Sequence, residues 1–301
     1  MKTFSSMTKR NVKIFFKDKA MFFTSLITPI ILLVLYMTFL AKVYRDSFAS
    51  AVPDGFEIDK NLLNGMVGGE IFSSILAVCC VTVAFCSNLL MVNDKVSGAR
   101  KDLVISPTKK SVFALSYYVA TLISTLIISI TATVACFVYI AVQGWYLSFA
   151  DVLLVFLDVF LLTMFGTALS SCINVFLSTN GQASAVGTIV SAGYGFICGA
   201  YMPISSFGVG LQNFLGFLPG TYGTSLLRNH ALRGVYAEML KQRYPADVVE
   251  KIKDSVDCNL YFFGKQVSIG TMYGIMIGSI VLLIGLYVLI NYLKNRKAVK
   301  N

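Results

Sequence analysis

Residues that could perform catalysis or bind a metal are few in this 301-residue chain and lie far apart. His230 is the only histidine, and the seven cysteines show no C-x-x-C pair and no zinc-like spacing. A structural zinc site needs about four Cys, His or carboxylate ligands, and a serine-protease-type triad needs a histidine beside a nucleophile and a carboxylate. The sequence therefore argues against a metal site and against a His-based catalytic triad.

The cysteines also give no disulfide framework. Six of them lie inside apolar stretches, where a thiol behaves as a small apolar side chain. Only Cys258 lies in a predicted external segment, and it has no obvious partner within the chain. We therefore expect no intrachain disulfide at Cys258.

A phosphate-binding loop is absent from the sequence as well. The P-loop pattern G-x-x-x-x-G-K-[ST] lets backbone N–H groups surround the phosphates of a nucleotide. Gly264-Lys265 is followed by Gln266, and no glycine lies five residues before Gly264. We therefore expect this chain not to bind ATP in that way, to hold no cofactor and to have no enzymatic activity of its own.

Six long apolar stretches must position whatever function the chain has. A span of about 20 apolar residues crosses the hydrocarbon core of a bilayer, and backbone groups inside that core are satisfied only in a helix. Asp158 is the single charge in all six stretches. The stretches are residues 21–41, 71–92, 112–142, 152–176, 183–202 and 272–293.

Composition and charge placement support the same fold class. Hydrophobic residues make up 56% of the chain and charged residues 13%, whereas a soluble domain averages about 25% charged residues. The net charge of +10 is concentrated in residues 1–20, 93–111 and 294–301, which fall on one side of the membrane if all six stretches cross it. The segment 42–70, on the other side, has more acidic than basic residues. This is the positive-inside pattern, so we expect both termini in the cytoplasm and contact with anionic lipid, not nucleic acid.

The segment before the first span has its own pattern. As a helix, residues 1–20 would place Val12, Phe15 and Phe16 on one side and Lys9, Lys13 and Lys17 along another, which is typical of a helix lying in the membrane interface. The alternative is an unstructured basic tail. A cleaved signal peptide ending at Ala49-Ser50-Ala51 is disfavoured, because span 21–41 is longer than a signal core of 7–15 residues.

The cytoplasmic loop 93–110 could carry a short helix. Residues 94–105 begin with acidic Asp94, and Ser106-Pro107 ends the helical pattern. Such a helix suits docking into a cleft of a partner protein, although an ordinary solvated positive loop is the alternative.

The whole pattern resembles the membrane subunit of an ABC-2-type ATP-binding-cassette exporter. The resemblance rests on a basic, aromatic stretch (residues 11–18), Thr28-Pro29 in the first span, the loop 94–103 followed by Ser106-Pro107, and Tyr201-Met202-Pro203-Ile204. It continues through Leu218-Pro219 and Leu226-Leu227-Arg228. It implies one ABC-2-type transmembrane domain over residues 1–301, in the plasma membrane of a bacterium.

The resemblance also implies partners. In that family the loop after the second helix is a coupling helix that seats in a separate ATPase subunit, which binds ATP and Mg. We therefore expect two copies of an ABC ATPase subunit and a second permease subunit, the same chain or a homologous one. The residues expected to couple to the ATPase are Asp94, Lys95, Gly98, Lys101, Asp102 and Leu103.

The segment 203–268 is too long for a simple turn. Its first part, 203–227, is apolar but interrupted by Gly and Pro, and such backbone is tolerated at membrane depth only where protein or a cavity covers it. We expect an external re-entrant hairpin here, as in the exporter family. The polar part, 228–265, could contain a short external helix beginning at 244–247.

The fifth span carries small residues at every fourth position. Gly187, Ser191, Gly195 and Gly199 would let another helix approach closely, and we expect this face to line a dimer contact or the transport pathway. In the last span, Gly270, Gly274 and Gly278 favour packing within the subunit. Because related exporters line their route with the second and fifth helices, the pathway candidates are Asn88, Tyr194 and Phe196. Aromatic rings at such positions are alternatively core residues.

Asp158 and Trp145 complete the set of notable residues. A carboxylate at the centre of a span costs about 2.5–3.5 kcal/mol, so we expect Asp158 to be interfacial or hydrogen-bonded, with a proton or cation relay as the alternative. Trp145 and Tyr146 suit the membrane interface as anchors.

The expected protein is thus an all-α integral membrane protein with six transmembrane helices, an N-terminal interfacial helix, a cytoplasmic coupling helix and an external hairpin. The expected function is an ATP-driven export permease for an amphipathic or lipid-like substrate such as a drug, peptide antibiotic or glycolipid. Two alternatives remain open, an ion-coupled secondary transporter and a non-transporting membrane immunity or anchor protein.

Overall fold

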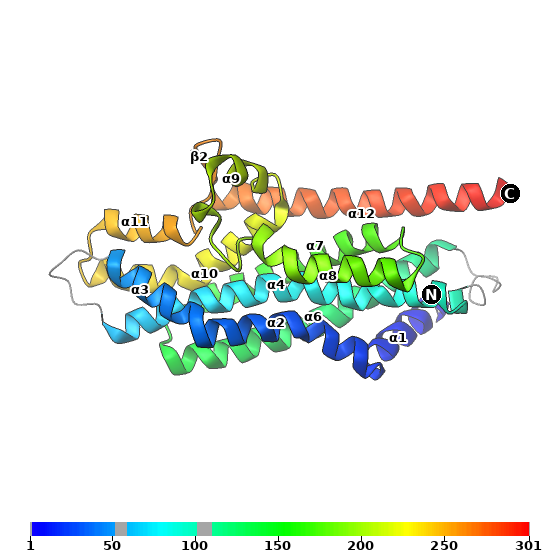
Figure 1. The fold of residues 1–301 in the computed structure, drawn as a ribbon, viewed down its shortest axis with the longest axis horizontal. Helices are drawn as coiled ribbons and strands as arrows, with labels where there is room; N and C mark the ends of the chain where they lie inside the picture. Colours follow the sequence, from blue (N-terminus) through cyan, green and yellow to red (C-terminus); the bar gives the residue numbers. More distant parts are fainter. Residues whose placement is uncertain (1, 52–58, 101–109, 301) are drawn as a thin grey trace.

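The computed structural model describes residues 2–51, 59–100 and 110–300. Long helices run side by side along one axis, and both ends of the chain lie at the same end of that axis (Figure 1). The only strands in the described part are β1 (Tyr261–Phe262) and β2 (Lys265–Gln266), which form a small antiparallel hairpin. The fold class is therefore all-helical, as predicted.

The first part of the chain forms helix α1, a long helix that runs from α2 into α3, and helix α4. Helix α1 (Lys2–Lys17) ends where Asp18 caps α2 (Lys19–Leu35) through its side chain and the backbone N–H of Met21. A π-helical turn at Tyr36–Leu40 links α2 to α3 (Ala41–Ala51). Helix α4 (Lys60–Val96) follows, capped by Asp59. The predicted second span, 71–92, is thus the central part of a longer helix.

Outside the segment 203–268, the rest of the chain adds three long helices and one shorter one. They are α6 (Lys110–Gln143), α7 (Phe149–Asn174), α8 (Asn180–Ile197) and α12 (Ile269–Lys300). Helix α7 begins with a reciprocal capping box between Ser148 and Asp151. Helix α4 lies at the centre of the bundle and packs against α2, α6, α7, α8 and α10.

Five helices of the described part are long and apolar enough to cross a membrane. They are the continuous helix 19–46, α4, α6, α7 and α12. Large apolar side chains are exposed along α2, α6 and α12, which is the surface expected in lipid. The fifth predicted span, 183–202, forms only the 18-residue helix α8, which ends at Ile197 and is not among these five.

The segment predicted as a hairpin folds into several short elements and one long buried helix. A 3-10 turn (Ile204–Ser206) leads to α9 (Val209–Leu215), then α10 (Pro219–Lys241) and α11 (Ala246–Ser255). Helix α10 starts with Pro219 in its first turn, where a missing N–H costs nothing. It packs against α4, α7 and α12, so α10 itself is largely covered by protein, whereas α9 and the β-hairpin are not.

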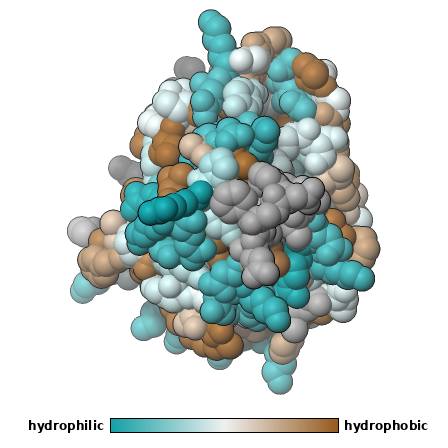
Figure 2. All heavy atoms as spheres, turned by 90° about the vertical axis from the view of Figure 1, so that its left-hand side faces the viewer, coloured by the Kyte–Doolittle hydropathy of each residue, from teal (hydrophilic) through white to brown (hydrophobic). Residues whose placement is uncertain are grey.

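The end of the molecule formed by α3, α10 and α11 differs from the apolar flanks formed by α2, α6 and α12. Viewed from this end, hydrophilic residues gather over much of the face, with hydrophobic ones toward the rim (Figure 2). We expect this end to lie in water.

Helix α10 approaches the turn between α6 and α7 so closely that a side chain is excluded. A Cβ on Gly234 would collide with the backbone carbonyl oxygen of Tyr146. Gly234→Ala should lower the free energy of unfolding by about 1–3 kcal/mol, because backbone on both sides must move. Thermal unfolding of the purified protein in detergent measures this.

Gly278→Ala is the matched control for that prediction. A Cβ on Gly278 meets nothing within 4 Å, so the substitution should be neutral or stabilise α12 by roughly 0.5–1 kcal/mol. Equal melting temperatures for the two variants would contradict the close approach at Gly234.

Candidate translocation groove and coupling turn

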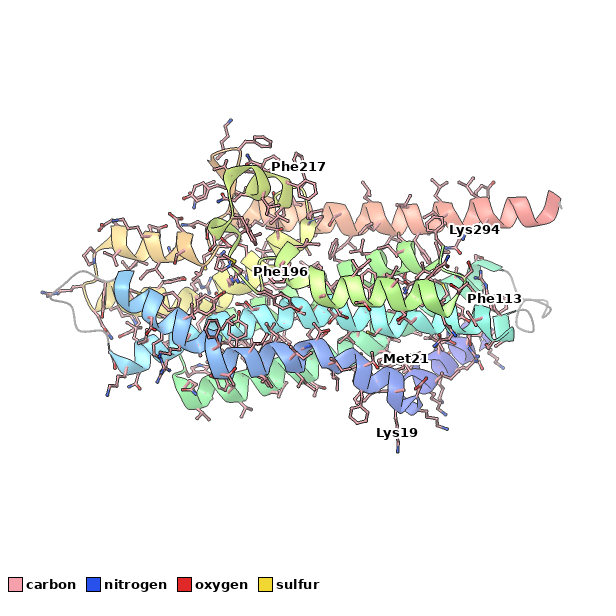
Figure 3. All side chains as sticks on the ribbon, viewed as in Figure 1. Lys19, Met21, Phe113, Phe196, Phe217 and Lys294 are labelled. Atoms are coloured by element: carbon pink, nitrogen blue, oxygen red, sulfur yellow. The ribbon has the colours of Figure 1, made fainter. Side chains whose placement is uncertain are left out.

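A wide groove of about 1280 Å³ lies between α2 and α8, with α4 as its floor. Its walls are mainly apolar, and its lining includes Ile27, Ile31 and Phe39 of the first span and Phe196 of α8 (Figure 3). Polar groups are spaced along it at Thr24, Thr28, Asn93, Asn180, Ser184, Thr188 and Ser191. The groove can therefore accept a molecule that is mostly apolar but carries some hydrogen-bonding groups.

The three predicted pathway residues fall in different places. Phe196 is 51% exposed and lines the groove. Asn88 is buried, and its amide donates to the hydroxyls of Ser170 and Ser171 at 3.1 and 2.9 Å, so it joins α4 to α7. Tyr194 is also buried in the core cluster, beside Gly220 of α10. In this structure Asn88 and Tyr194 are packing residues and do not line the groove.

The four small residues predicted on one face of the fifth span also separate. Gly187 and Ser191 line the groove, and a Cβ on Gly187 would meet nothing. Gly195 is covered by the ring of Tyr201, whose hydroxyl donates to the carbonyl of Ser191 at 3.1 Å. Gly199 lies beyond the end of α8 with φ of +77°, a conformation that favours glycine. Only the first two remain available to another helix.

A buried ionic cluster lies next to the end of the groove near α11. Arg228 of α10 lies 2.6 Å from Glu70 of α4 and 3.3 Å from Asp257, and the three side chains are at most 3% exposed. Arg228 also donates to the carbonyl of Gly199 at 2.7 Å and to Ser74 at 3.2 Å. The cluster was not predicted, because Glu70 was assigned to the segment outside the second span and Arg228 to the polar external part.

Asp257 joins the segment after α11 to the 3-10 turn at this end of the groove. Its carboxylate accepts from the backbone N–H groups of Ile204 and Ser205, next to Pro203 and Ser206 in the groove lining. Val256, its neighbour in sequence, also lines the groove. Burial raises the pKa of Asp257 above its ordinary value, although Arg228 and the two N–H groups oppose this.

Asp158 is hydrogen-bonded on both oxygens in the interior. Its Oδ2 lies 2.6 Å from Nδ1 of His230, and Oδ1 accepts from the hydroxyl of Tyr273 at 2.7 Å. It therefore joins α7, α10 and α12, and its partner His230 could not be located from sequence spacing. Asp158 does not line the groove. This geometry fits the hydrogen-bonded structural role.

Substitutions at Asp158 separate a structural role from a relay. Asp158→Leu leaves Nδ1 of buried His230 and the half-buried hydroxyl of Tyr273 without their shared partner, and should cost up to about 1–3 kcal/mol for each. Asp158→Asn keeps one acceptor oxygen and should retain most of the thermal stability and all transport. An Asp158→Asn protein that unfolds normally but has lost transport would instead support a proton relay.

Cys258 is a free, buried thiol next to the hydroxyl of Tyr236, at 3.5 Å. Burial raises its pKa to about 12, so almost no thiolate forms at neutral pH. We expect a maleimide added to intact vesicles to leave Cys258 unmodified and to label it only after denaturation. Rapid labelling of the folded protein, read by mass spectrometry, would contradict this placement.

The other end of the groove leads to the turn after α4, which was predicted to be cytoplasmic and to couple to an ATPase. Asp94 is buried there and accepts from Nη1 of Arg10 at 2.8 Å and from the hydroxyl of Tyr117 at 2.5 Å. The hydrogen bond to Asp94 holds the pKa of Arg10 above its ordinary value. Asp94 thus ties the last turn of α4 to α1 and α6.

Lys95 reaches the opposite side of the same turn. Its ammonium donates to the carbonyls of Asn174, Val175 and Leu177 at 3.0, 3.0 and 2.8 Å. Lys294 of α12 donates to the carbonyl of Val175 at 2.7 Å. Two cations therefore hold the carboxyl end of α7, where the helix dipole is negative.

These contacts change part of the coupling prediction. Asp94 and Lys95 belong to α4, which ends at Val96, and they are engaged with this chain's own helices, so they do not form a free docking face. Gly98 makes the turn with φ of +82°, and helical residues follow at Ala99 and Arg100. Lys101, Asp102 and Leu103 lie outside the described residues, so their docking role stays a prediction.

Within residues 2–51, 59–100 and 110–300, no group of three or more His, Cys, Asp or Glu side chains could hold a metal ion. The arrangement is that of a multi-pass membrane protein built around an apolar groove.

A comparison with protein families identifies the family of this membrane protein. The family model described as ABC-2 type transporter matches residues 2–231, which is more than half of the chain. The chain therefore belongs to the ABC-2 type transporter family and is a membrane permease of an ABC-type transporter, a class that works with an ABC ATPase. A comparison with curated proteins gives no match.

Proposed function

We propose that this chain is the permease subunit of an ATP-driven ABC exporter and that the groove between α2 and α8 is half of its substrate route. The single observation that carries the proposal is this groove, which is long, apolar and open on one side. It lies between the first and fifth predicted spans, above α4. An anchor or immunity protein would have no need of such a groove.

Helix α8, added to the five candidate spans, would bring the number of membrane crossings to six. Its 18 residues span about 27 Å, close to the 30 Å of a hydrocarbon core. Ile189 is 69% exposed and would face lipid or another chain. With six crossings, both termini lie on the cytoplasmic side, as the positive charge distribution indicates.

A second permease chain would close the open side of the groove. The walls expose large apolar side chains, among them Ile27 and Ile31 of α2, which gain from burial against a second copy. The enclosed route would suit an amphipathic or lipid-like cargo, because its few hydroxyl and amide groups carry no charge.

Two ATPase subunits would drive this pair of permeases through the turn after α4. The contacts of Asp94 and Lys95 give that turn firm connections to α1, α6 and α7. A displacement of the turn would therefore move several helices together, which favours alternating access of the groove.

The direct test is reconstitution of the chain with its ATPase subunit in vesicles. We expect labelled lipid or an amphipathic dye to move only with ATP, and movement to stop when the P-loop lysine of the ATPase is replaced. Transport that needs an ion gradient but not ATP would support the secondary carrier instead.

The groove itself is tested by filling it. Gly187→Trp puts bulk into open space in the groove, and Gly278→Trp puts the same bulk into open space on α12, outside it. We expect transport to fall at least about tenfold for the first variant, and a tenfold change corresponds to about 1.4 kcal/mol. Transport should persist for the second variant. Equal transport by both would exclude the groove as the route.

A further inference from the structure

A side lobe projects sideways from the bundle, beside the start of α12 (Figure 1). It consists of α9, the connection to α10 and the β1–β2 hairpin, and we call it the aromatic lobe. Figure 3 labels Phe217 on it. Neither the transport pathway nor the coupling turn accounts for this lobe.

The aromatic lobe exposes far more apolar surface than a water-facing loop. Its exposed side chains are Val209 (72%), Leu211 (46%), Phe214 (61%), Phe217 (66%), Tyr261 (45%) and Phe263 (63%). Contiguous apolar patches of this kind mark interaction surfaces. None of the six lines the groove, so the patch is a separate feature.

The lobe is held in a defined shape. The ring of Phe217 lies 5.0 Å from that of Phe262 and 6.2 Å from that of Phe263, each edge to face. The backbone N–H of Phe263 donates to Asn213 at 3.1 Å, which fastens the hairpin to α9. The exposed rings are therefore presented by a fixed scaffold and not by a loose loop.

The aromatic lobe lies close to the start of α12, a candidate membrane span. Only Val267 and Ser268 separate β2 from Ile269, the first residue of the spanning helix α12. At about 3.3–3.6 Å per residue, the hairpin lies within roughly 10 Å of the point where α12 begins. Apolar exposure continues along α12 from its first residue, with Ile269 at 44% and Ile277 at 50%.

We propose that the aromatic lobe is a lipid-binding anchor, with its rings in the boundary between headgroups and acyl chains on the side of the membrane where α11 lies. A structure projecting sideways at this level meets the bilayer interface, which aromatic rings favour. Exposed Lys265, the first residue of β2 after the hairpin turn, suits contact with phosphate groups, since its chain can extend away from the rings. The occupant is thus lipid, and the proposal does not depend on the cargo, the direction of transport or the ATPase.

Tryptophan fluorescence tests this placement, because Trp145 is the only native tryptophan. In a Trp145→Phe background, Phe217→Trp would report on the lobe and Lys251→Trp on α11, whose Lys251 side chain is 75% exposed. Both proteins are placed in phosphatidylcholine vesicles containing brominated acyl chains, with acrylamide as the aqueous quencher. Gel filtration checks that each variant is folded.

We expect brominated lipid to remove most of the emission of Phe217→Trp, more strongly when the bromines are near the headgroup end of the chain. Acrylamide should have little effect on it, and Lys251→Trp should behave in the opposite way. Quenching of Phe217→Trp by acrylamide alone would place the lobe in water and overturn the proposal. Protection from both quenchers would place it against a second protein chain and also overturn it; Phe263→Trp repeats the measurement at an independent site.

Discussion

Replacing Arg228 by Met should cost the protein about 3–5 kcal/mol of stability, because it leaves two buried carboxylates without their cation. Glu70 is fully buried in α4, and Asp257 is 2% exposed. The same substitution removes the hydrogen bond to the carbonyl of Gly199, which fixes the end of α8. We expect little folded protein after expression, as measured by fluorescence-detected gel filtration, and a strongly lowered melting temperature.

Two further variants show whether charge is the cause. Arg228→Lys keeps the charge but cannot reach Glu70, Asp257 and Gly199 together, so it should be intermediate. Glu70→Gln added to Arg228→Met removes one unpaired charge and should recover part of the loss. If Arg228→Met melts like the unmodified protein, the cluster does not hold this end of the groove together.

Replacing Lys95 by Met should loosen the connection between α7 and α8. The ammonium makes three charge-assisted hydrogen bonds to the carboxyl end of α7, and a hydrogen bond to a charged group contributes about 1.5–3 kcal/mol. Hydrogen–deuterium exchange of residues 175–182 should rise at least about tenfold, which corresponds to a local opening made easier by about 1.4 kcal/mol. In the reconstituted complex, ATP hydrolysis should continue while transport falls.

Lys294→Met is the matched control, since Lys294 donates only one hydrogen bond to the same region. It should show the same change in exchange, but smaller. Because both lysines share the carbonyl of Val175, the double variant should deviate from the sum of the single effects. Exchange that is unchanged in Lys95→Met would mean that the connection is held by other contacts.

The sequence was informative wherever length and hydropathy decide structure. Uninterrupted apolar stretches predict helices, because backbone groups in lipid have no other partner, and the described helices follow these stretches closely. Helix ends with local signals were also predictable, as at Pro245 before α11. The fifth span was overestimated because Gly199 ends the helix through a backbone conformation that hydropathy does not reveal.

The charged and polar contacts were beyond the sequence because their partners are distant in the chain. Glu70 and Arg228 are separated by 158 positions, and only the packing of α10 against α4 brings them together. Asn88 and Tyr194 were predicted to line the transport pathway, because a helix face cannot be assigned without its neighbours. Asp94 and Lys95 lie in a short stretch of mixed charge, and spacing alone does not tell a docking surface from an internal clamp.

The unbroken length of α4 has a mechanical consequence. Its 37 residues measure about 55 Å, nearly twice the hydrocarbon thickness, so one stiff rod joins the two aqueous sides. At that length, a tilt of about 5° about one tip swings the other by roughly 5 Å. A small rotation of the turn that follows Val96 would therefore displace the far rim near Leu62, so α4 can transmit movement from one end of the protein to the other.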